Sequence, residues 1–291
     1  SFVSVQGALV MHPIFAFGSE DHRRSFLPKL ASGEMIGCFG LTEPDHGSDP
    51  GGMVTRAQRD GDDWILSGAK MWITNGSIAD IAVVWAKDED DVIRGFLVEC
   101  DRPGFSAPEM KRKMSLRASI TSELVLQDVR VPDSHRLPGA EGLKAPLSCL
   151  TQARFGIAWG VIGSAMECFH TAVEYAKSRI QFEKPIAEFQ AIQWKLAEME
   201  TKIQAARLLI RKAALLKDQG RPHVKEAAVA KLFSSRNANW CASQAVQIHG
   251  GAGYCRDFPV ERFFRDARVT EIYEGTTEVQ KIVIARHLLR E

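Results

Sequence analysis

The 291-residue sequence has no excess of charge of either sign, no long apolar run and no paired cysteine motif. Its 37 Lys and Arg residues balance 36 Asp and Glu residues, so the chain has no bulk charge to hold a nucleic-acid backbone or an anionic membrane surface. No apolar run is long enough to span a bilayer, and no signal-peptide pattern opens the chain. We therefore expect neither a nucleic-acid nor a membrane partner, and any anionic ligand must be held by local groups.

The cysteines and the acidic residues indicate no metal site. The six cysteines form no CxxC pair and no metal-ligand spacing, which favours reduced thiols in a reducing compartment. The cytoplasm of a bacterium or the mitochondrial matrix of a eukaryote fits this expectation. The acidic cluster at 88–91 lacks a His or a further carboxylate spaced to complete a metal site, so we predict a solvated turn there.

The chain changes character twice along its length, and its 45% hydrophobic content is enough to bury a sizeable core. Residues 1–36 have helix-periodic apolar positions, residues 37–145 alternate in short strand-like runs, and residues 146–291 return to long helix-periodic segments. This order predicts an α+β protein of three domains with these boundaries. Ser1 is not an initiator Met and falls at once into an apolar-rich segment, which leads us to expect a missing N-terminal portion.

Turn residues separate the predicted elements. Asp60-Gly61 is a hairpin signal between two alternating runs. Pro222 stands at a helix-start position, and Gly250-Gly251 at a helix end. The expected strands are 53–58, 64–67, 71–74, 81–86, 96–99 and 123–131, and the expected long helices are 146–178, 187–217 and 222–249.

Glu274 lies between the apolar pair Ile272-Tyr273 and the start of a new helix. Gly275 allows the backbone to change direction, and Thr277 followed by Gln280 has capping-box spacing. A carboxyl group enclosed with the two apolar side chains would have its pKa raised into the range of a general base. The alternative is an acid that only complements the helix dipole.

Three other segments could form a ligand site. The loop at 41–50 is dense in small and hydroxyl residues that could offer N–H and O–H groups to a polar ligand, with a plain turn as the alternative. Trp72 and Thr74 share a strand face and could present an indole and a hydroxyl to a flat heterocycle, with core packing of Trp72 as the alternative. The glycines at 250–253 allow close backbone approach.

Together these segments resemble the acyl-CoA dehydrogenase family, in the family's order and over nearly the whole chain. Within the family, the chain is most similar to the glutaryl-CoA dehydrogenase branch through residues 4–6, 115–119 and 153–160. The family motifs are Leu41-Thr42-Glu43-Pro44 with Gly47-Ser48-Asp49, Trp72-Ile73-Thr74, Arg179 with Phe182, Gln190, Gln247 with Gly250-Gly251, and Tyr273-Glu274-Gly275-Thr276.

The resemblance implies an N-terminal helical domain that is largely absent here, a middle β-barrel or sandwich domain and a C-terminal four-helix bundle. It also implies FAD bound between the last two domains and across a subunit interface, a homotetramer, and an electron-transfer flavoprotein as electron acceptor. Glu274 matches the catalytic base. The residues that match FAD contacts are Phe39, Leu41, Thr42, Ser48, Trp72, Ile73, Thr74, Arg179, Phe182, Gln190, Gln247, Gly250, Gly251 and Thr276. The residues that match acyl-CoA contacts are Ser4, Ser48, Leu147, Ser148, Leu150, Arg154 and Gly275.

The implied reaction is FAD-dependent α,β-dehydrogenation of an acyl-CoA thioester, in the glutaryl branch with oxidative decarboxylation to crotonyl-CoA and carbon dioxide. A short-chain or branched-chain substrate, an oxidase, and a non-catalytic relative used for assembly or nucleic-acid binding are the alternatives. Glu183 stands where the family usually has Gly, and the tail at 277–289 is more like short-chain members. The Arg that binds the distal carboxylate in glutaryl enzymes would precede Ser1.

Overall fold

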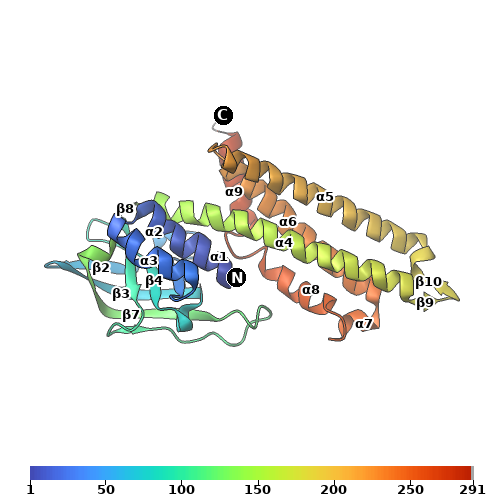
Figure 1. The fold of residues 1–291 in the computed structure, drawn as a ribbon, viewed down its shortest axis with the longest axis horizontal. Helices are drawn as coiled ribbons and strands as arrows, with labels where there is room; N and C mark the ends of the chain where they lie inside the picture. The colour runs from blue at the N-terminus through green and yellow to red at the C-terminus, as the bar shows by residue number, and fades with distance from the viewer. Residues whose placement is uncertain (290–291) are drawn as a thin grey trace. The chain divides into compact units, whose positions relative to one another are not determined.

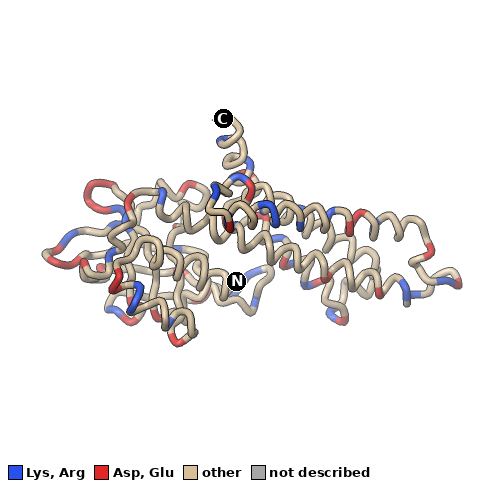
Figure 2. Tube along the Cα trace, turned by 45° about the horizontal axis from the view of Figure 1, so that its top comes forward, with Lys and Arg blue, Asp and Glu red and all other residues tan. Residues whose placement is uncertain are grey.

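The computed structural model describes residues 1–289, which fold into two compact units that divide after Ala153 (Figure 1). Basic and acidic residues are interspersed along the chain in both units (Figure 2). Of the helices in the described part of the chain, none is long and apolar enough to cross a membrane. The predicted α+β arrangement, with a helical start, a β region and a helical C-terminal part, is confirmed.

Short helical segments open the first unit. They are α1 (Phe2–Val5), the π-helix η1 (Gln6–Met11), α2 (His12–Phe17) and α3 (Glu20–Ser32). Ser19 caps α3 by accepting a hydrogen bond from the His22 N–H at 3.1 Å, and Gly33 ends the helix with φ +79°. The helices predicted over 1–36 are therefore confirmed.

The β region is a single sheet, eight-stranded within the described residues, in the order β6-β7-β3-β2-β4-β5-β8, with β1 paired in parallel to β4. The remaining neighbours pair antiparallel except β2 and β4. Its strands are β1 (Gly37–Gly40), β2 (Arg56–Asp60), β3 (Asp63–Thr74), β4 (Ile81–Lys87), β5 (Ile93–Glu99), β6 (Phe105–Ser106), β7 (Thr121–Pro132) and β8 (Arg136–Glu141). Short 3-10 turns lie between strands at η2 (Pro50–Gly52), η3 (Gly76–Ile78) and η4 (Asp133–His135).

The strands predicted at 64–67 and 71–74 are one continuous strand, β3, so the predicted break between them is wrong. The register of β3 against β7 shifts between Lys70 and Ile73, and this irregularity mimics a strand end in the sequence pattern. The predicted hairpin is present, because Asp60 pairs with Asp63 across Gly61 at φ +63°. The acidic cluster forms a turn in which Asp88 accepts hydrogen bonds from the Asp90 and Val92 N–H groups.

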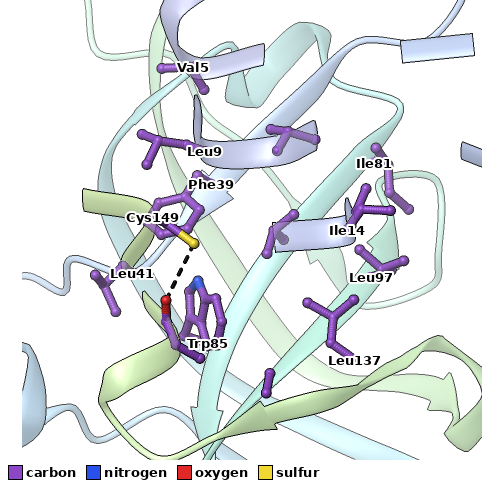
Figure 3. Close-up of a cluster of buried hydrophobic side chains, with 14 of the residues drawn as sticks. Val5, Leu9, Ile14, Phe39, Leu41, Ile81, Trp85, Leu97, Leu137 and Cys149 are labelled. Carbon is purple, nitrogen blue, oxygen red and sulfur yellow. Dashed lines mark hydrogen bonds between the residues drawn. The ribbon is translucent and has the colours of Figure 1, made fainter. Parts of the chain in front are cut away.

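Both faces of β4 are buried, which explains its unbroken apolar run. Alternate residues such as Val83 and Trp85 face a core shared with Ile14 of α2, while Ala82 and Val84 face a second core with Phe96. Figure 3 shows Val5, Leu9 and Ile14 over the sheet residues of the first core, with Cys149 from the start of α4 beside them. The helices at 1–36 thus share one core with the sheet.

The second unit is built from long helices. Its core is formed by small and medium apolar residues such as Ala172, Met199 and Cys241, which let the helices pack closely. The predicted helical C-terminal part is confirmed. The elements are α4 (Lys144–Ser178), which begins in the first unit, the strands β9 (Ile180–Gln181) and β10 (Lys184–Pro185), η5 (Ile186–Glu188), α5 (Gln190–Asp218), α6 (Val224–His249), α7 (Gly251–Tyr254), α8 (Val260–Val269) and α9 (Thr277–Leu288).

Candidate active site

Glu274 lies in the turn between α8 and α9, in a left-handed backbone conformation. Its φ is +54°, and Gly275 follows at φ +85°. The positive φ favours glycine at residue 275, and a Cβ atom there would lie 2.7 Å from the Gln280 Nε2 atom and displace that side chain. A left-handed non-glycine residue costs roughly 1–3 kcal/mol and persists only where the surrounding structure holds it. Such strain is typical of a functional position.

The helix cap in this turn differs from the predicted one. Thr276, not Thr277, is the N-cap of α9, and its Oγ1 accepts a hydrogen bond from the Val279 N–H at 3.3 Å. The Gln280 side chain does not complete a capping box, because its Nε2 donates to the carbonyl oxygens of Glu274 (3.1 Å) and Gly275 (2.8 Å). The predicted capping box is therefore wrong, and Gln280 instead holds the turn that carries Glu274.

The Glu274 carboxyl group has one buried oxygen atom. Its Oε2 atom is buried and has no hydrogen-bond partner among the described residues. Burial raises the pKa of Glu274 to about 7, against the opposing charges of Arg154 and Lys231. A carboxyl group that only complements the helix dipole would be solvated, so the geometry favours the general-base interpretation over that alternative.

Two buried cations on neighbouring helices bind the main chain of this turn. Arg154 of α4 is 4% exposed and donates its Nε hydrogen bond to the Glu274 carbonyl oxygen at 3.3 Å. Lys231 of α6 is fully buried and donates its Nζ hydrogen bond to the Gly275 carbonyl oxygen at 2.8 Å. Arg154 was among the predicted acyl-CoA contacts, whereas Lys231 was missed. A single lysine among the small apolar residues at 227–233 was the sequence signal that could have revealed it.

Most of the predicted cofactor residues in the second unit are exposed. Arg179, Phe182, Gln190, Gln247 and Gly250 are all exposed, and Thr276 is half-buried. Gly250 adopts φ +59° with ψ −135°, and a Cβ atom there or at Gly251 would meet no other atom within 4 Å. Their backbone is therefore open to a ligand.

The hairpin turn between β9 and β10 presents Phe182. Phe182 has φ +52° and is 87% exposed, and Glu183 follows with φ +66°. Two left-handed central residues are the geometry of a type I′ turn, which glycine adopts without strain. The backbone at Glu183 thus has the form that glycine would favour, although the residue is a glutamate.

In the first unit, Glu43 organises the loop after β1. Its carboxylate accepts hydrogen bonds from Lys70 Nζ (2.8 Å), the Val54 N–H (2.7 Å), and the Thr55 N–H (3.0 Å) and Oγ1 (2.5 Å). Burial alone would raise the pKa of Glu43, but the Lys70 charge and these hydrogen bonds hold it well below its usual range. The Met71 N–H also donates to the Thr42 carbonyl at 2.8 Å. The loop is therefore tied to β3 and is more than a plain turn.

Trp72 is not a core residue. It has φ +64° within the irregular part of β3, and 59% of it is exposed. The core-packing alternative for Trp72 is therefore wrong. Ile73 beside it is buried and Thr74 is half-buried. The strained backbone presents the indole outward, as a ring-stacking contact requires.

Other predicted contacts in the first unit have buried side chains. Phe39 and Leu41 belong to the core, where the Phe39 and Trp85 rings pack edge-to-face with their centroids 6.1 Å apart (Figure 3). Together with Ile73, they could offer a ligand only main-chain groups. Thr42 is half-buried and Ser48 is exposed, so these two side chains remain accessible.

The predicted acyl-CoA residues of the first unit are partly accessible. Leu147 is 38% exposed, whereas the Ser148 hydroxyl donates to the Ala145 carbonyl at 2.8 Å within its own helix. Leu150 packs against the core, and Ser4 is half-buried. No group of three or more His, Cys, Asp or Glu side chains in the described part of the chain could hold a metal ion.

Models of three acyl-CoA dehydrogenase domains match successive parts of the chain: the N-terminal domain at residues 1–34, the middle domain at 38–129 and the C-terminal domain at 140–289. The chain belongs to the acyl-CoA dehydrogenase family, an enzyme family. It is 46% identical over 284 residues to the probable acyl-CoA dehydrogenase YngJ of Bacillus subtilis (strain 168), a match that covers 96% of this chain and 75% of that protein. It is 44% identical over 294 residues to the human mitochondrial short-chain specific acyl-CoA dehydrogenase, with 99% and 71% covered.

Solved structures agree with this family. Glutaryl-CoA dehydrogenase from Mycobacterium smegmatis superposes with a TM-score of 0.97 at 51% identity, over all of this chain and 75% of that one. A glutaryl-CoA dehydrogenase from the same organism in complex with FADH2 superposes with a TM-score of 0.97 at 48% identity, again over all of this chain and 75% of that one. A structure described as an electron transferring flavoprotein of Acidaminococcus fermentans superposes with a TM-score of 0.96 at 42% identity, over all of this chain and 78% of that one.

Proposed function

We propose that this acyl-CoA dehydrogenase uses FAD and acts on glutaryl-CoA, with oxidative decarboxylation to crotonyl-CoA and carbon dioxide. The observation that carries the proposal is the geometry of Glu274: a strained turn, a buried carboxyl oxygen without a partner, and a pKa raised to about 7. The α-hydrogen of a thioester is only weakly acidic. Its removal therefore needs a desolvated carboxylate whose pKa lies near the working pH. Glu274 is the residue that meets this requirement.

The residues present fit a dinucleotide such as FAD. Arg179, Gln190 and Gln247 offer exposed polar side chains, and Gly250 and Gly251 offer open backbone. Trp72 offers an outward indole that could stack on a flat ring. The FADH2 complex of a similar protein supports this assignment. FAD, when bound, accepts the β-hydrogen of the substrate as hydride.

The role of the chain's own residues is to bind and orient the substrate and to take the proton. Glu274 removes the α-proton onto its carboxylate, and the enclosure that leaves Oε2 without a partner also keeps water from that atom. Ser4, Ser48, Leu147, Arg154 and Gly275 are our proposed acyl-CoA contacts. Ser148 and Leu150 remain in this proposal through their main-chain groups, since their side chains are engaged.

The glutaryl assignment is favoured by the 51% identity to the Mycobacterium smegmatis enzyme and by the segments at 4–6, 115–119 and 153–160. Gln6, in the first of these segments, has a structural role, because its amide donates to the carbonyls of Leu30 and Met35. The second candidate is a short-chain acyl-CoA, which is favoured by the 44% identity to the human short-chain enzyme and by the tail at 277–289.

We further propose a homotetramer that passes electrons to an electron-transfer flavoprotein. Trp194, Leu208 and Leu215 on α5 are each more than half exposed, and their positions differ by multiples of seven. Residues at that spacing share one helix face, and an apolar face of this kind is typical of a subunit contact. The similarity to a structure described as an electron transferring flavoprotein supports the choice of acceptor.

The family-model boundaries support our proposed domains at 1–36, 37–145 and 146–291. All six cysteines are free, and four of them are buried. This supports a reducing compartment, either a bacterial cytoplasm or a mitochondrial matrix.

Anaerobic bleaching of the flavin by a panel of acyl-CoA thioesters, with mass analysis of the products, tests the proposed function. We expect bleaching by glutaryl-CoA and release of crotonyl-CoA, and no bleaching by any thioester in a Glu274→Gln control that retains its flavin. Bleaching by monocarboxylic thioesters alone would select the short-chain candidate. A protein that contains no flavin and reacts with no thioester would contradict the proposal.

A further inference from the structure

Lys231 is a fully buried lysine on α6. Complete burial of an ammonium group is costly unless it is paired, so such residues are rare. Its Nζ atom donates a hydrogen bond to the carbonyl oxygen of Gly275 at 2.8 Å, across 44 residues of sequence. A long-range contact of a buried charge with the residue that follows Glu274 indicates a role in this turn.

The turn that Lys231 binds is strained at two successive residues. Glu274 and Gly275 both have left-handed φ values. The Glu274 carbonyl accepts from Arg154 and Gln280, and the Gly275 carbonyl accepts from Lys231 and Gln280. Three side chains from α4, α6 and α9 therefore hold the two carbonyls. Lys231 is the one that brings a charge to Gly275.

The charges around Glu274 come from every element packed against the turn. Arg154 on α4 and Lys231 on α6 are the cations, and both lower the pKa of the carboxyl group against the effect of burial. Glu271 in the same turn and Glu278 on α9 lie near Lys231 and favour its charged form. Burial lowers the pKa of Lys231 to about 8, and Arg154 adds to this effect. Tyr273 has its pKa raised to about 12, mainly by burial, with Glu274 and Asp266 of α8 contributing.

We propose that Lys231 is a positioning residue for Glu274, which fixes the left-handed turn through the Gly275 carbonyl and supplies a buried positive charge beside the carboxyl group. The inference rests on the proposed function, because it concerns how the proposed base is kept ready. Without this charge the carboxyl group holds its proton to higher pH. Fewer molecules then carry a carboxylate able to accept the substrate proton.

The test uses the flavin-loaded protein and separates charge from turn geometry. Lys231→Met removes both the charge and the hydrogen bond, Lys231→Gln removes the charge but keeps a donor for Gly275, and Gln280→Met removes hydrogen bonds to both carbonyls without changing charge. Exposed Lys212 provides the Lys212→Met control. The carboxyl titration is followed by infrared difference spectroscopy, with Glu274→Gln identifying the band.

We expect both Lys231 variants to raise the pH at which the Glu274 band titrates by about one unit, since an opposite charge nearby shifts a carboxyl pKa by roughly one to three units. The acid limb of kcat/KM should move in the same direction, with kcat reduced more than KM is changed. Gln280→Met should lower kcat with little shift of the acid limb, and Lys212→Met should change neither.

An unchanged Glu274 titration in a folded Lys231 variant would overturn the inference. If Lys231→Met does not fold, the Glu274 titration is measured in Lys231→Gln instead. The infrared titration needs no turnover. A protein that bleaches with no thioester but shows the expected shift would therefore contradict the proposed function and not the role of Lys231.

Discussion

Glu43, which is buried, and Glu274, which has a buried carboxyl oxygen, lie in different units, and each is near a fully buried lysine whose pKa is lowered to about 8. Their own pKa values are nevertheless shifted in opposite directions, downward for Glu43 and upward for Glu274. Burial has the same sign at both sites. Hydrogen bonds to the carboxylate help to lower the pKa of Glu43, and no such hydrogen bond opposes burial at Glu274.

At Glu43 the donors point at the carboxylate: Lys70 Nζ, the Thr55 hydroxyl, and the main-chain N–H groups of Val54 and Thr55. At Glu274 the donors point at the neighbouring carbonyls, and the carboxyl Oε2 has none. The same pair of residue types thus forms a structural ion pair at one site and, at the other, the setting of our proposed base. The chemistry follows from the direction of the hydrogen bonds and not from residue identity.

Glu274→Gln should have the largest effect, because it removes the proton acceptor and leaves the shape of the turn. We expect turnover with the preferred acyl-CoA to fall by roughly a thousandfold or more, since a positioned general base commonly contributes factors of 10²–10⁴. Flavin content per protein should be unchanged. Steady-state kinetics and the flavin absorbance ratio measure the two quantities.

The exposed Glu34, in the first unit, gives a control in Glu34→Gln, which should stay close to wild-type activity. Near-normal turnover in Glu274→Gln would show that Glu274 is not the general base. The difference between Glu274 and Glu43 would then have no bearing on function.

Lys70→Met should be the most damaging change at the structural pair. It leaves the Glu43 carboxylate buried with its charge uncompensated, a situation that typically costs about 3–5 kcal/mol. The midpoint of urea unfolding should fall accordingly, and Lys70→Met combined with Glu43→Gln should recover part of the loss. Arg24→Met, which breaks the exposed pair with Glu20, should change stability by less than about 1 kcal/mol. An equally small effect of Lys70→Met would show that the two sites do not differ in the way we infer.

The sequence predicted Glu274 and its surroundings because the signals are local. An apolar pair, a glycine and a helix start within a few residues are enough to place a carboxyl group at a turn. The cap was assigned to the wrong threonine, since Thr276 and Thr277 are adjacent and both suit an N-cap. The left-handed conformation of Gly275 decides between them, and it is visible only in the structure.

The two buried lysines could not be predicted in the same way. Lys231 meets Gly275 across 44 residues, and Lys70 meets Glu43 across 27. Each contact depends on how helices or strands pack against one another. The spacing of apolar residues along the sequence does not predict this packing. Lys70 also lies at the register shift of β3, where we predicted a break between strands. A lysine within a short apolar stretch, at 227–233 in α6 and at 69–73 in β3, was the available sign in both cases.

The pH dependence of stability should have opposite signs at the two glutamates. The folded pKa of Glu274 is raised from 4.5 to about 7. The stability it contributes is present below pH 4.5 and is lost as the pH rises to 7, by up to about 3 kcal/mol. Glu274→Gln should therefore match wild type near pH 4 and become more stable than wild type above pH 7. Urea unfolding of both proteins across this range measures the difference.

Glu43 gives the opposite case, because its folded pKa is lowered. Its stabilising effect is present above the unfolded pKa and is lost as the pH falls through the folded one. The deficit of Glu43→Gln relative to wild type should therefore shrink in acid. If both variants changed with pH in the same direction, the assigned pKa shifts would be wrong at one of the two sites.

A third glutamate separates backbone strain from buried charge. Glu183 shares the left-handed backbone of Glu274, with φ +66°, but it is exposed in the turn between β9 and β10. Glu183→Gly should raise stability by less than about 1 kcal/mol, because the left-handed conformation costs an L-residue about 1–2 kcal/mol and the added entropy of the unfolded chain offsets part of the gain. Gln181→Gly, in β9, should instead lower stability. An increase in the urea midpoint for Glu183→Gly alone would measure the free-energy cost of a left-handed backbone at an exposed residue. Any larger destabilisation at Glu274 would then be due to its carboxyl group. A decrease would mean that the Glu183 side chain stabilises the hairpin by more than its backbone strains it.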